Sequence, residues 1–311
     1  MNDVINIELK ELGINYKMYT PNRKTNLIER IVDNTKQPYE YEMLITMANQ
    51  LADIDPKKNK TILDVGMNIG NHALFFAALG YKVIGIEANP KMSAIAKKSV
   101  EINGFEDKIK IIECGASDKD EILYFKEEIP ENFGAMHLET KGQGGEIKCM
   151  RIDDLGINEE ICLLKMDIEG MEAPALRGAK ELISKNKPLI YIESQLIKNF
   201  NTNADILEAL GYIHFFMWDM GAPTHLFKHM DSINESQLAQ KFARDSAILR
   251  LHSSCTPQGT FIENTTARTF NELAEFKKIT LEALVGLLGG KIGTQSFDGK
   301  INELIKLLQN R

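Results

Sequence analysis

The sequence has few features that would cross-link the chain or bind zinc. Its 311 residues include only four cysteines, and their wide spacing fits neither a set of zinc ligands nor a redox dithiol. Scattered cysteines of this kind are typical of buried free thiols in a reducing compartment. The four are Cys114, Cys149, Cys162 and Cys255.

Long apolar runs are also missing. No run approaches the roughly 20 residues that a membrane-spanning helix needs, and the first ten residues, which carry acids, do not resemble a secretory signal. We therefore expect a soluble, cytoplasmic protein. The net charge of −7 provides no overall field that would attract nucleic acid, although a local basic patch could still do so, and no nucleic-acid partner is expected.

From residue 61 onward, apolar runs typical of strands alternate with stretches typical of helices. This alternation predicts a mostly parallel sheet with helices on both faces, an α/β fold. The predicted strands are 61–65, 82–87, 109–114, 161–166, 189–193, 212–217 and 246–251, and the predicted helices are 71–79, 90–103 and 173–184.

The flanking segments differ from this central part. We predict an N-terminal helical segment over residues 1–58, with helices at 25–34 and 39–54, and a cofactor-binding domain over 59–254. An insertion at about 117–154 interrupts that domain, with strands at 122–125 and 146–152. Residues 255–311 read as a helical extension with helices at 270–288 and 299–308, which could pair two copies of the chain or pack on its own flank.

The first predicted strand runs into a glycine-containing turn that opens a helix. Gly66 and Gly70 allow close backbone approach to a ligand, and the helix N-terminus offers unpaired N–H donors. Asn68 replaces the glycine that admits a pyrophosphate in dinucleotide-binding proteins. Asp64, ahead of the turn, suits a ligand with a positive amino group. S-adenosylmethionine fits this pattern, because it carries an ammonium and a ribose but no phosphate; a purely structural turn is the alternative.

Further cofactor contacts are predicted along the chain. Glu87 ends the second strand about 20 residues later, where a carboxylate can accept from both ribose hydroxyls, and Ala88 could pack on adenine. The small residues at 115–117 would border the adenine edge, and His72 would lie near the methionine end of the cofactor. The alternative for Glu87 is a helix cap, and for residues 115–117 it is a plain turn. For His72 the alternative is capping or packing. The small residues are Gly115, Ala116 and Ser117.

Acidic residues gather at the end of the strand 161–166. Asp167 and Glu169 lie two positions apart, so an extended backbone would point both the same way, and Glu193 ends the next strand. They would either remove a proton from an acceptor hydroxyl or bind a divalent cation. His137, in the insertion, is a further candidate base. Glu172 would be catalytic, cap the next helix or pair with Arg177.

Three segments taken together resemble the FkbM family of methyltransferases. They are residues 64–72, 86–90 and 165–179, which include Lys165-Met-Asp-Ile-Glu-Gly-Met-Glu172, and the resemblance covers roughly residues 40–250. The family usually has alanine where Met67 stands. The resemblance implies a class I methyltransferase fold, Rossmann-like with a seven-stranded sheet, and methyl transfer commonly to hydroxyls of sugars or natural products.

The sequence therefore predicts an S-adenosylmethionine-dependent O-methyltransferase acting on a hydroxyl of a sugar, a glycan or another small polar metabolite. Three alternatives stay open: an N-methyltransferase, a cofactor-binding assembly partner without its own activity, and a nucleotide-dependent oxidoreductase, which Asp64 and Asn68 disfavour. The acceptor, the metal requirement and the oligomeric state, including a homodimer through the C-terminal helices, are not fixed by any motif.

Overall fold

A computed structural model describes residues 3–126, 138–142, 145–219, 222–234, 236–238 and 240–241. Several predictions from the sequence lie outside these residues: the candidate base His137, the strand at 246–251, Cys255 and the helices after residue 255. The three cysteines that the structure does describe are buried and free. Within the same ranges, no helix is both long and apolar enough to cross a membrane.

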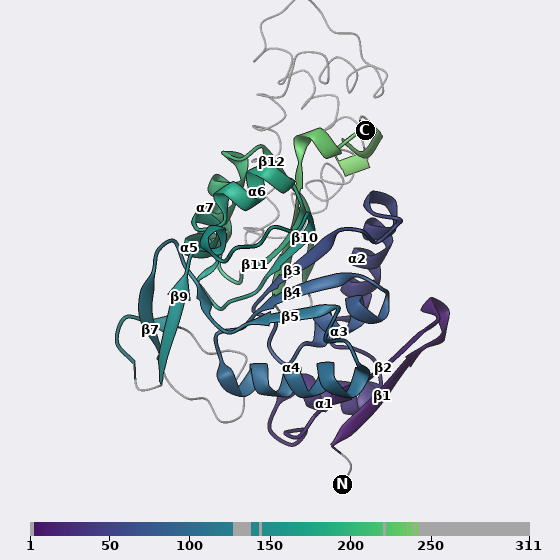
Figure 1. The fold of residues 1–311 in the computed structure, drawn as a ribbon. Coiled ribbons are helices and arrows are strands. Elements are labelled where there is room, and N and C mark those ends of the chain that lie inside the picture. The colour runs from purple at the N-terminus through teal and green to yellow at the C-terminus, as the bar shows by residue number, and fades with distance from the viewer. Residues whose placement is uncertain are drawn as a thin grey trace, which may run out of the picture. The chain divides into compact units, whose positions relative to one another are not determined.

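Seven strands form the central sheet, in the order β12-β13-β11-β10-β3-β4-β5 (Figure 1). The pairs from β11 to β5 are parallel, and β13 pairs with β11 in the antiparallel direction. This arrangement confirms the predicted mostly parallel, seven-stranded class I methyltransferase sheet. The strands are β3 (Thr61–Val65), β4 (Lys82–Ile86), β5 (Ile109–Ile112), β10 (Ile161–Met166), β11 (Leu189–Glu193), β12 (Tyr212–Asp219) and β13 (Pro223–His229), of which β13 was not predicted.

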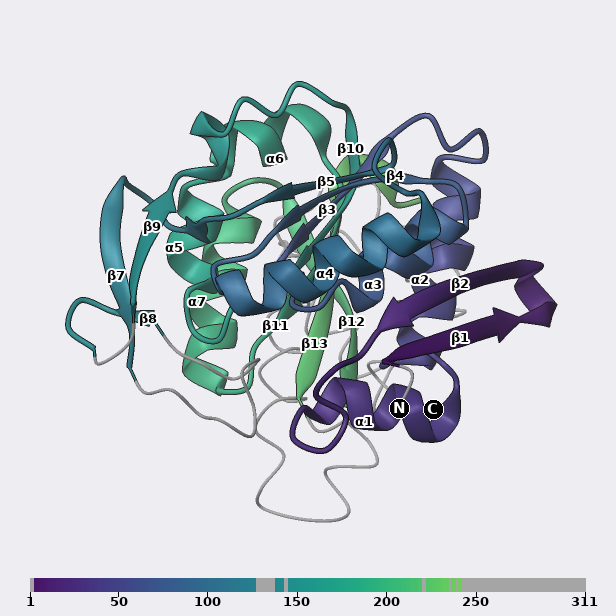
Figure 2. The same ribbon diagram turned by 60° about the horizontal axis from the view of Figure 1, so that its bottom comes forward.

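Helices cover both faces of this sheet. Figure 2 shows α3 and α4 on one face, and α5, α6 and α7 pack on the other. The predicted helix over 173–184 is two helices, because Gly178 interrupts it where a Cβ would overlap the carbonyl oxygen of Ser117. The bounds are α3 (Asn71–Ala78), α4 (Pro90–Asn103), α5 (Glu172–Arg177), α6 (Lys180–Asn186) and α7 (Ile197–Glu208).

The N-terminal segment is only partly helical. The predicted helices exist as α1 (Leu27–Thr35) and α2 (Tyr41–Ile54), but an unpredicted antiparallel hairpin of β1 (Val4–Leu9) and β2 (Ile14–Tyr19) precedes them. Apolar residues alternate along β1 and face inward, which is a strand pattern. The side chain of Asn103 in α4 accepts from the Lys17 N–H at 2.7 Å and donates to its carbonyl at 2.6 Å, so the hairpin is fastened to the main domain.

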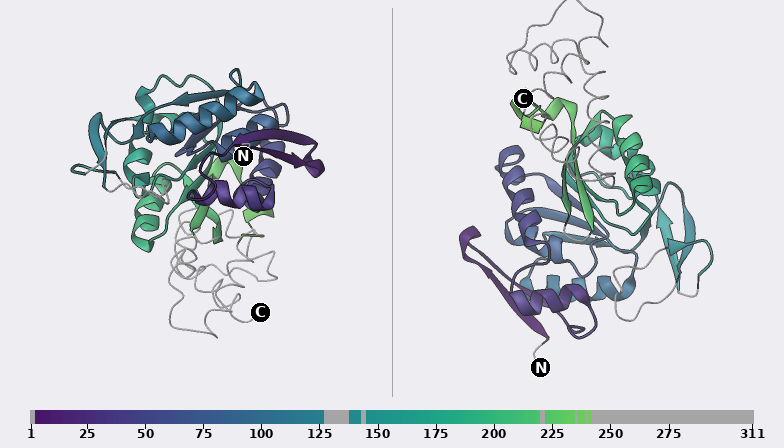
Figure 3. Two further views of the ribbon diagram at one scale, coloured as in Figure 1. Left: turned by 90° about the horizontal axis from the view of Figure 1, so that it is seen from below. Right: turned by 180° about the vertical axis from the view of Figure 1, so that it is seen from behind.

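The insertion forms a small sheet of its own, in the order β6-β9-β7-β8. β7 (Glu121–Phe125) and β9 (Glu146–Met150) confirm two predicted strands, and β6 (Gly115–Ala116) and β8 (Leu138–Glu139) complete the sheet. Seen from behind, the purple hairpin and the teal insertion lie on opposite sides of the central sheet (Figure 3). The insertion has an apolar cluster of its own, formed by Leu123, Phe125, Ile147 and Cys149. Ala88, Leu138 and Met171 pack against this cluster.

Residues 211–215 and the described residues between 228 and 241 belong to a second compact unit. Its described part is held together locally. The Met230 N–H donates to the carbonyl of Gly211 at 2.9 Å, and the rings of Tyr212 and His229 lie edge to face with centroids 5.2 Å apart. None of the residues of the site below belongs to this unit.

Candidate active site

A pocket of about 410 Å³ opens where β3, β4, β10 and β11 end. Its volume is within the range of small-molecule sites, and the carboxyl ends of parallel strands are where open α/β sheets bind ligands. The structure brings together most of the site residues that the sequence predicted. Those that line the pocket are Gly66, Asn68, Glu87, Ala88, Gly115, Ala116, Asp167, Glu169 and Glu193.

Four predicted cofactor residues lie elsewhere. Asp64 is buried in β3, with its Oδ1 3.7 Å from the Nζ of Lys165. Gly70 is the N-cap of α3. The Nε2 of His72 lies 3.1 Å from a carboxylate oxygen of Glu40, and Ser117 donates to Glu121 at 2.6 Å. For His72 and Ser117 these contacts favour the structural alternatives.

The glycine turn after β3 lies close to the strand end of β10. Gly66 has a φ of 79°, and a Cβ there would overlap the carbonyl oxygen of Asp167. Glycine is therefore required by both the conformation and the space. Asn68 has a φ of 53°, and its backbone N–H points to Glu87. The turn is therefore held close to both Asp167 and Glu87.

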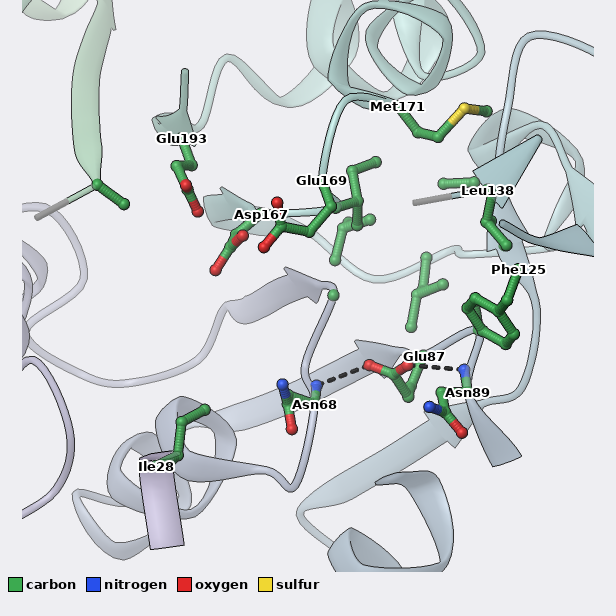
Figure 4. A pocket seen from close by; sticks show the side chains of 18 of the residues that line it. Ile28, Asn68, Glu87, Asn89, Phe125, Leu138, Asp167, Glu169, Met171 and Glu193 are labelled. Atoms are coloured by element: carbon green, nitrogen blue, oxygen red, sulfur yellow. Dashed lines mark hydrogen bonds between the residues drawn. The ribbon is translucent and has the colours of Figure 1, made fainter. Parts of the chain in front are cut away.

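Glu87 is the polar centre of one half of the pocket. Its two carboxylate oxygens accept the backbone N–H groups of Asn68 and Asn89, each at 2.7 Å (Figure 4). Burial raises the pKa of Glu87 to about 7, against the effect of these two bonds. Each carboxylate oxygen can still accept another hydrogen bond, so the group is able to receive a pair of hydroxyls.

An apolar wall completes this half. Phe125 and Leu138 of the insertion, with Met171 after β10, line the pocket on the far side of Glu87 (Figure 4). Ala88 packs against the same cluster. The half therefore combines a hydroxyl-binding carboxylate with a flat apolar wall, which suits a nucleoside. We call it the nucleoside half: Glu87, Ala88, Phe125, Leu138 and Met171.

The other half is acidic. Figure 4 shows Asp167, Glu169 and Glu193 pointing toward one another. Glu193 and Asp167 are hydrogen-bonded, and burial together with the Asp167 charge raises the pKa of Glu193 to about 9. Burial also acts to raise the pKa of Asp167, but the Lys165 ammonium and the bond from Glu193 outweigh it, so that pKa is lowered. Because the two carboxyl groups interact, their protons belong to the pair, and the charged form is favoured on Asp167.

Two neighbouring glutamates have different roles. Glu169 faces the pocket, and the side-chain amide of Gln195 donates to Glu193 at 2.8 Å and to Glu169 at 3.5 Å. Glu172 is buried and accepts the backbone N–H groups of Ile168 and Gly170, both at 3.1 Å. Glu172 therefore has a structural role: it stabilises the loop before α5 and does not cap that helix, because both N–H groups precede it.

Arg177 does not pair with Glu172. Its guanidinium instead donates to Asp118 at 2.9 Å. In the described part of the chain, no group of three or more histidine, cysteine, aspartate or glutamate side chains has the geometry of a metal site. The metal alternative for Asp167, Glu169 and Glu193 therefore has no preformed arrangement to support it.

The N-terminal segment supplies lining residues that no motif indicated: Leu27, Ile28, Tyr39 and Glu40. Asn71 holds the backbone of Tyr39, accepting its N–H at 2.9 Å and donating to its carbonyl at 3.0 Å. The next residue, His72, pairs with Glu40. The sequence offered one signal for this contact, the polar pair Asn71 and His72 at the start of α3. Their side chains contact Tyr39 and Glu40 of the N-terminal segment.

Comparisons with known proteins agree with this geometry. The family model described as the methyltransferase FkbM domain matches residues 64–233. No curated protein matches the chain. Among solved structures, an FkbM methyltransferase from Methylobacillus flagellatus is 21% identical over 55% of this chain and 44% of its own, with a TM-score of 0.40. The chain thus spans less than half the length of that protein.

Two further solved structures are similar at lower identity. A SAM-dependent O-methyltransferase from Thermotoga maritima is 13% identical over 69% of this chain and 73% of its own, with a TM-score of 0.41. A magnesium protoporphyrin IX methyltransferase from Synechocystis, with bound SAM, is 11% identical over 65% of this chain and 84% of its own, also with a TM-score of 0.41. Since the family match covers more than half of the chain, this protein belongs to the FkbM methyltransferase family.

Proposed function

We propose that the protein transfers a methyl group from S-adenosylmethionine to a hydroxyl of a sugar, a glycan or another small polar metabolite. The observation that carries this proposal is the group of Asp167, Glu169 and Glu193, whose carboxyl groups point toward one another in a pocket whose other half suits a nucleoside. An ionised carboxylate at that position supplies the proton acceptor that a hydroxyl needs during methyl transfer.

The residues present fit the cofactor. The two free lone-pair directions of the Glu87 carboxylate suit the ribose hydroxyls, and the apolar wall suits adenine. Gly115 and Ala116 would border the ring edge, and Gly66 and Asn68 would face the methionine portion. Asp64 lies behind the turn, so its charge acts on the cofactor ammonium through the field and not by contact.

The cofactor supplies an electrophilic methyl group: the acceptor oxygen bonds to the methyl carbon as the carbon–sulfur bond breaks, and S-adenosylhomocysteine leaves. Asp167 accepts the hydroxyl proton in this step. Glu193 keeps its own proton and holds Asp167 in place through their hydrogen bond. Glu169, facing the same space, is the second candidate acceptor. The remaining task of the chain is alignment, which is worth several powers of ten in rate.

The acceptor would lie between the acidic half and the N-terminal segment. Burial raises the pKa of Tyr39 to about 12, and the charges of Glu40, Asp167 and Glu193 add to this, so the phenol stays protonated and lies within reach of their field. It can donate a hydrogen bond to an acceptor oxygen. Leu27 and Ile28 add apolar surface beside it. We call this second region the acceptor wall: Leu27, Ile28, Tyr39 and Glu40.

A screen with labelled methyl donor tests the proposal. Purified protein is incubated with a panel of nucleotide-sugars and glycans, with and without a chelator, and the products are identified by mass spectrometry. Methyl ethers support the proposal. Methylamines would establish N-methylation instead, and loss of transfer in the chelator arm would show a metal requirement. Transfer to no acceptor, with cofactor binding intact, would favour an assembly partner without its own activity.

The remaining assignments are part of the same proposal. We propose residues 59–254 as the catalytic domain, residues 1–58 as the segment that bears the acceptor wall, and residues 255–311 as an extension that pairs two copies in the cytoplasm. Sedimentation of a variant that ends at residue 254 tests the pairing. A dimer that survives the truncation would assign the interface to another part of the chain.

A further inference from the structure

Lys165 is a buried cation beside the pocket. It lies in β10, one residue before the strand ends, and only 5% of its surface is exposed. A buried ammonium is costly unless charge and hydrogen bonds compensate for it. Burial alone would lower the pKa of Lys165, yet the carboxylates of Asp167, Asp64 and Glu40 raise it above its ordinary value. The lysine is therefore charged, and its surroundings are built to keep it so.

Three contacts define its position. The Nζ of Lys165 donates to the carbonyl oxygen of Gly66 at 3.2 Å and to Oδ2 of Asp167 at 3.3 Å, and Oδ1 of Asp64 lies 3.7 Å away. The ammonium therefore makes two hydrogen bonds and has a third oxygen, of a carboxylate, at ion-pair distance. The parallel register pairs Lys165 with Asp64 on β3, which places both side chains on the same face.

These contacts join two parts of the site that come from different strands. Gly66 belongs to the turn that faces the cofactor, and Asp167 is the group to which we assign the hydroxyl proton. The backbone adds a second link, because the Asp167 N–H donates to the carbonyl of Val65 at 3.1 Å. The Lys165 side chain hydrogen-bonds to both Gly66 and Asp167, so it links the turn to the acid.

Neutralising Asp64 would be a simpler role for the lysine. Both Asp64 oxygens are buried and, among the described residues, have no hydrogen-bond partner, so Lys165 is their compensating charge. That role predicts only an effect on stability. Neutralising Asp64 does not explain the contact with the Gly66 carbonyl, because a carbonyl carries no net charge.

We propose that Lys165 is a positioning residue that fixes the glycine turn and the Asp167 carboxylate relative to each other. This inference rests on the proposed function, since it assigns Asp167 to the acceptor. It predicts that removing the ammonium weakens cofactor-product binding even when the charge of Asp64 has been removed as well. S-adenosylhomocysteine is the probe, because its binding can be measured before the acceptor is known.

The test compares four proteins by calorimetry with S-adenosylhomocysteine and by thermal unfolding. Lys165→Met alone leaves Asp64 uncompensated and is expected to lower Tm. The double variant D64N/K165M removes both charges and is expected to recover most of the Tm, yet to bind S-adenosylhomocysteine about tenfold more weakly than wild type, the loss typical of one charge-assisted hydrogen bond. Asp64→Asn alone is the matched control, in which Lys165 keeps Gly66 and Asp167, and its loss is expected to be smaller than about threefold on the same scale.

Each outcome decides the question. Wild-type affinity in D64N/K165M would overturn the proposal, and so would its failure to fold, because either result would leave Lys165 with a structural role only. A loss in D64N as large as in the double variant would assign the effect to Asp64. Failure of the proposed function is a separate result: in that case the wild type itself does not bind S-adenosylhomocysteine.

Discussion

The nucleoside half of the pocket and the acceptor wall come from different parts of the chain. The polar centre of the nucleoside half, Glu87, directly follows β4 inside the family-matched region 64–233. The acceptor wall comes from residues 27–40, which precede that region. The nucleoside half therefore lies in the part of the chain that the family model matches, and the acceptor wall lies outside it. The contrast teaches that the cofactor of such an enzyme can be inferred from motifs, whereas its acceptor depends on segments that pack onto the domain from outside.

The largest effect is expected in the acidic half of the pocket. Asp167→Asn removes the proton acceptor but keeps the size of the side chain, so methyl transfer to the acceptor found in the screen should fall by at least about 100-fold. Binding of S-adenosylhomocysteine should change little, because the amide oxygen can still accept from Lys165, whereas the unfolding temperature should fall, because the buried ammonium loses the charge of Asp167. An Asp167→Asn enzyme with wild-type turnover would refute the assignment and move attention to Glu169.

The apolar wall of the nucleoside half comes next. Phe125→Ala should weaken S-adenosylhomocysteine binding by about tenfold, because a ring that covers adenine loses its contact area. Ile122→Ala on the same strand is the matched control: Ile122 is 47% exposed and does not line the pocket, so its affinity should equal that of wild type. Equal affinities for the two variants would show that the insertion does not contribute to the nucleoside half.

A smaller effect is expected at the acceptor wall. Tyr39→Phe removes one donor that faces Asp167 and Glu193, and should raise KM for the acceptor by roughly fivefold, the usual size for one neutral hydrogen bond. The affinity for S-adenosylhomocysteine should stay constant. Tyr41→Phe, whose hydroxyl bonds to Glu11 outside the pocket, serves as the control. A change in the affinity for S-adenosylhomocysteine without a change in KM for the acceptor would assign Tyr39 to the nucleoside half.

The smallest expected effect concerns stability against pH. The pKa of Glu193 is raised from 4.5 to about 9 in the folded state, so the folded protein binds this proton more tightly than the unfolded chain. Its contribution to stability is complete below pH 4.5 and is lost as the pH rises toward 9. Between about pH 8 and pH 9, above the pKa of about 7 of the Glu87 carboxyl, Glu193→Gln should reduce the fall in unfolding free energy. Urea unfolding at several pH values measures this slope; identical slopes in the two proteins would contradict the shared proton.

Much of the fold and half of the site could be predicted from the sequence, for a physical reason. Glu87 and Glu193 each end a short apolar run, and the carboxyl ends of parallel strands converge, so their proximity follows from local pattern alone. Tyr39 and Leu27 reach the pocket only because Asn71 and His72 hold residues 39 and 40 in place. Contacts between residues so far apart in the sequence leave no local sequence pattern, so they could not be predicted.

Two differences in the fold have different causes. The hairpin β1–β2 carries a local strand pattern, six residues of alternating apolar and polar side chains in β1, which the helical interpretation of residues 1–58 overlooked. The break between α5 and α6 lies at Gly178, where the close approach of the Ser117 carbonyl cannot be seen in the sequence. Only the second difference depends on long-range packing.

Calorimetry of the wild-type protein tests the central claim most directly. The claim is that Glu87 and the glycine turn receive a phosphate-free nucleoside that carries an amino acid. It predicts that S-adenosylhomocysteine binds with one site per chain, that Glu87→Gln weakens this binding by about tenfold through the loss of a charged acceptor, and that NADH gives no heat. Tight binding of NADH, with no binding of S-adenosylhomocysteine, would contradict the account.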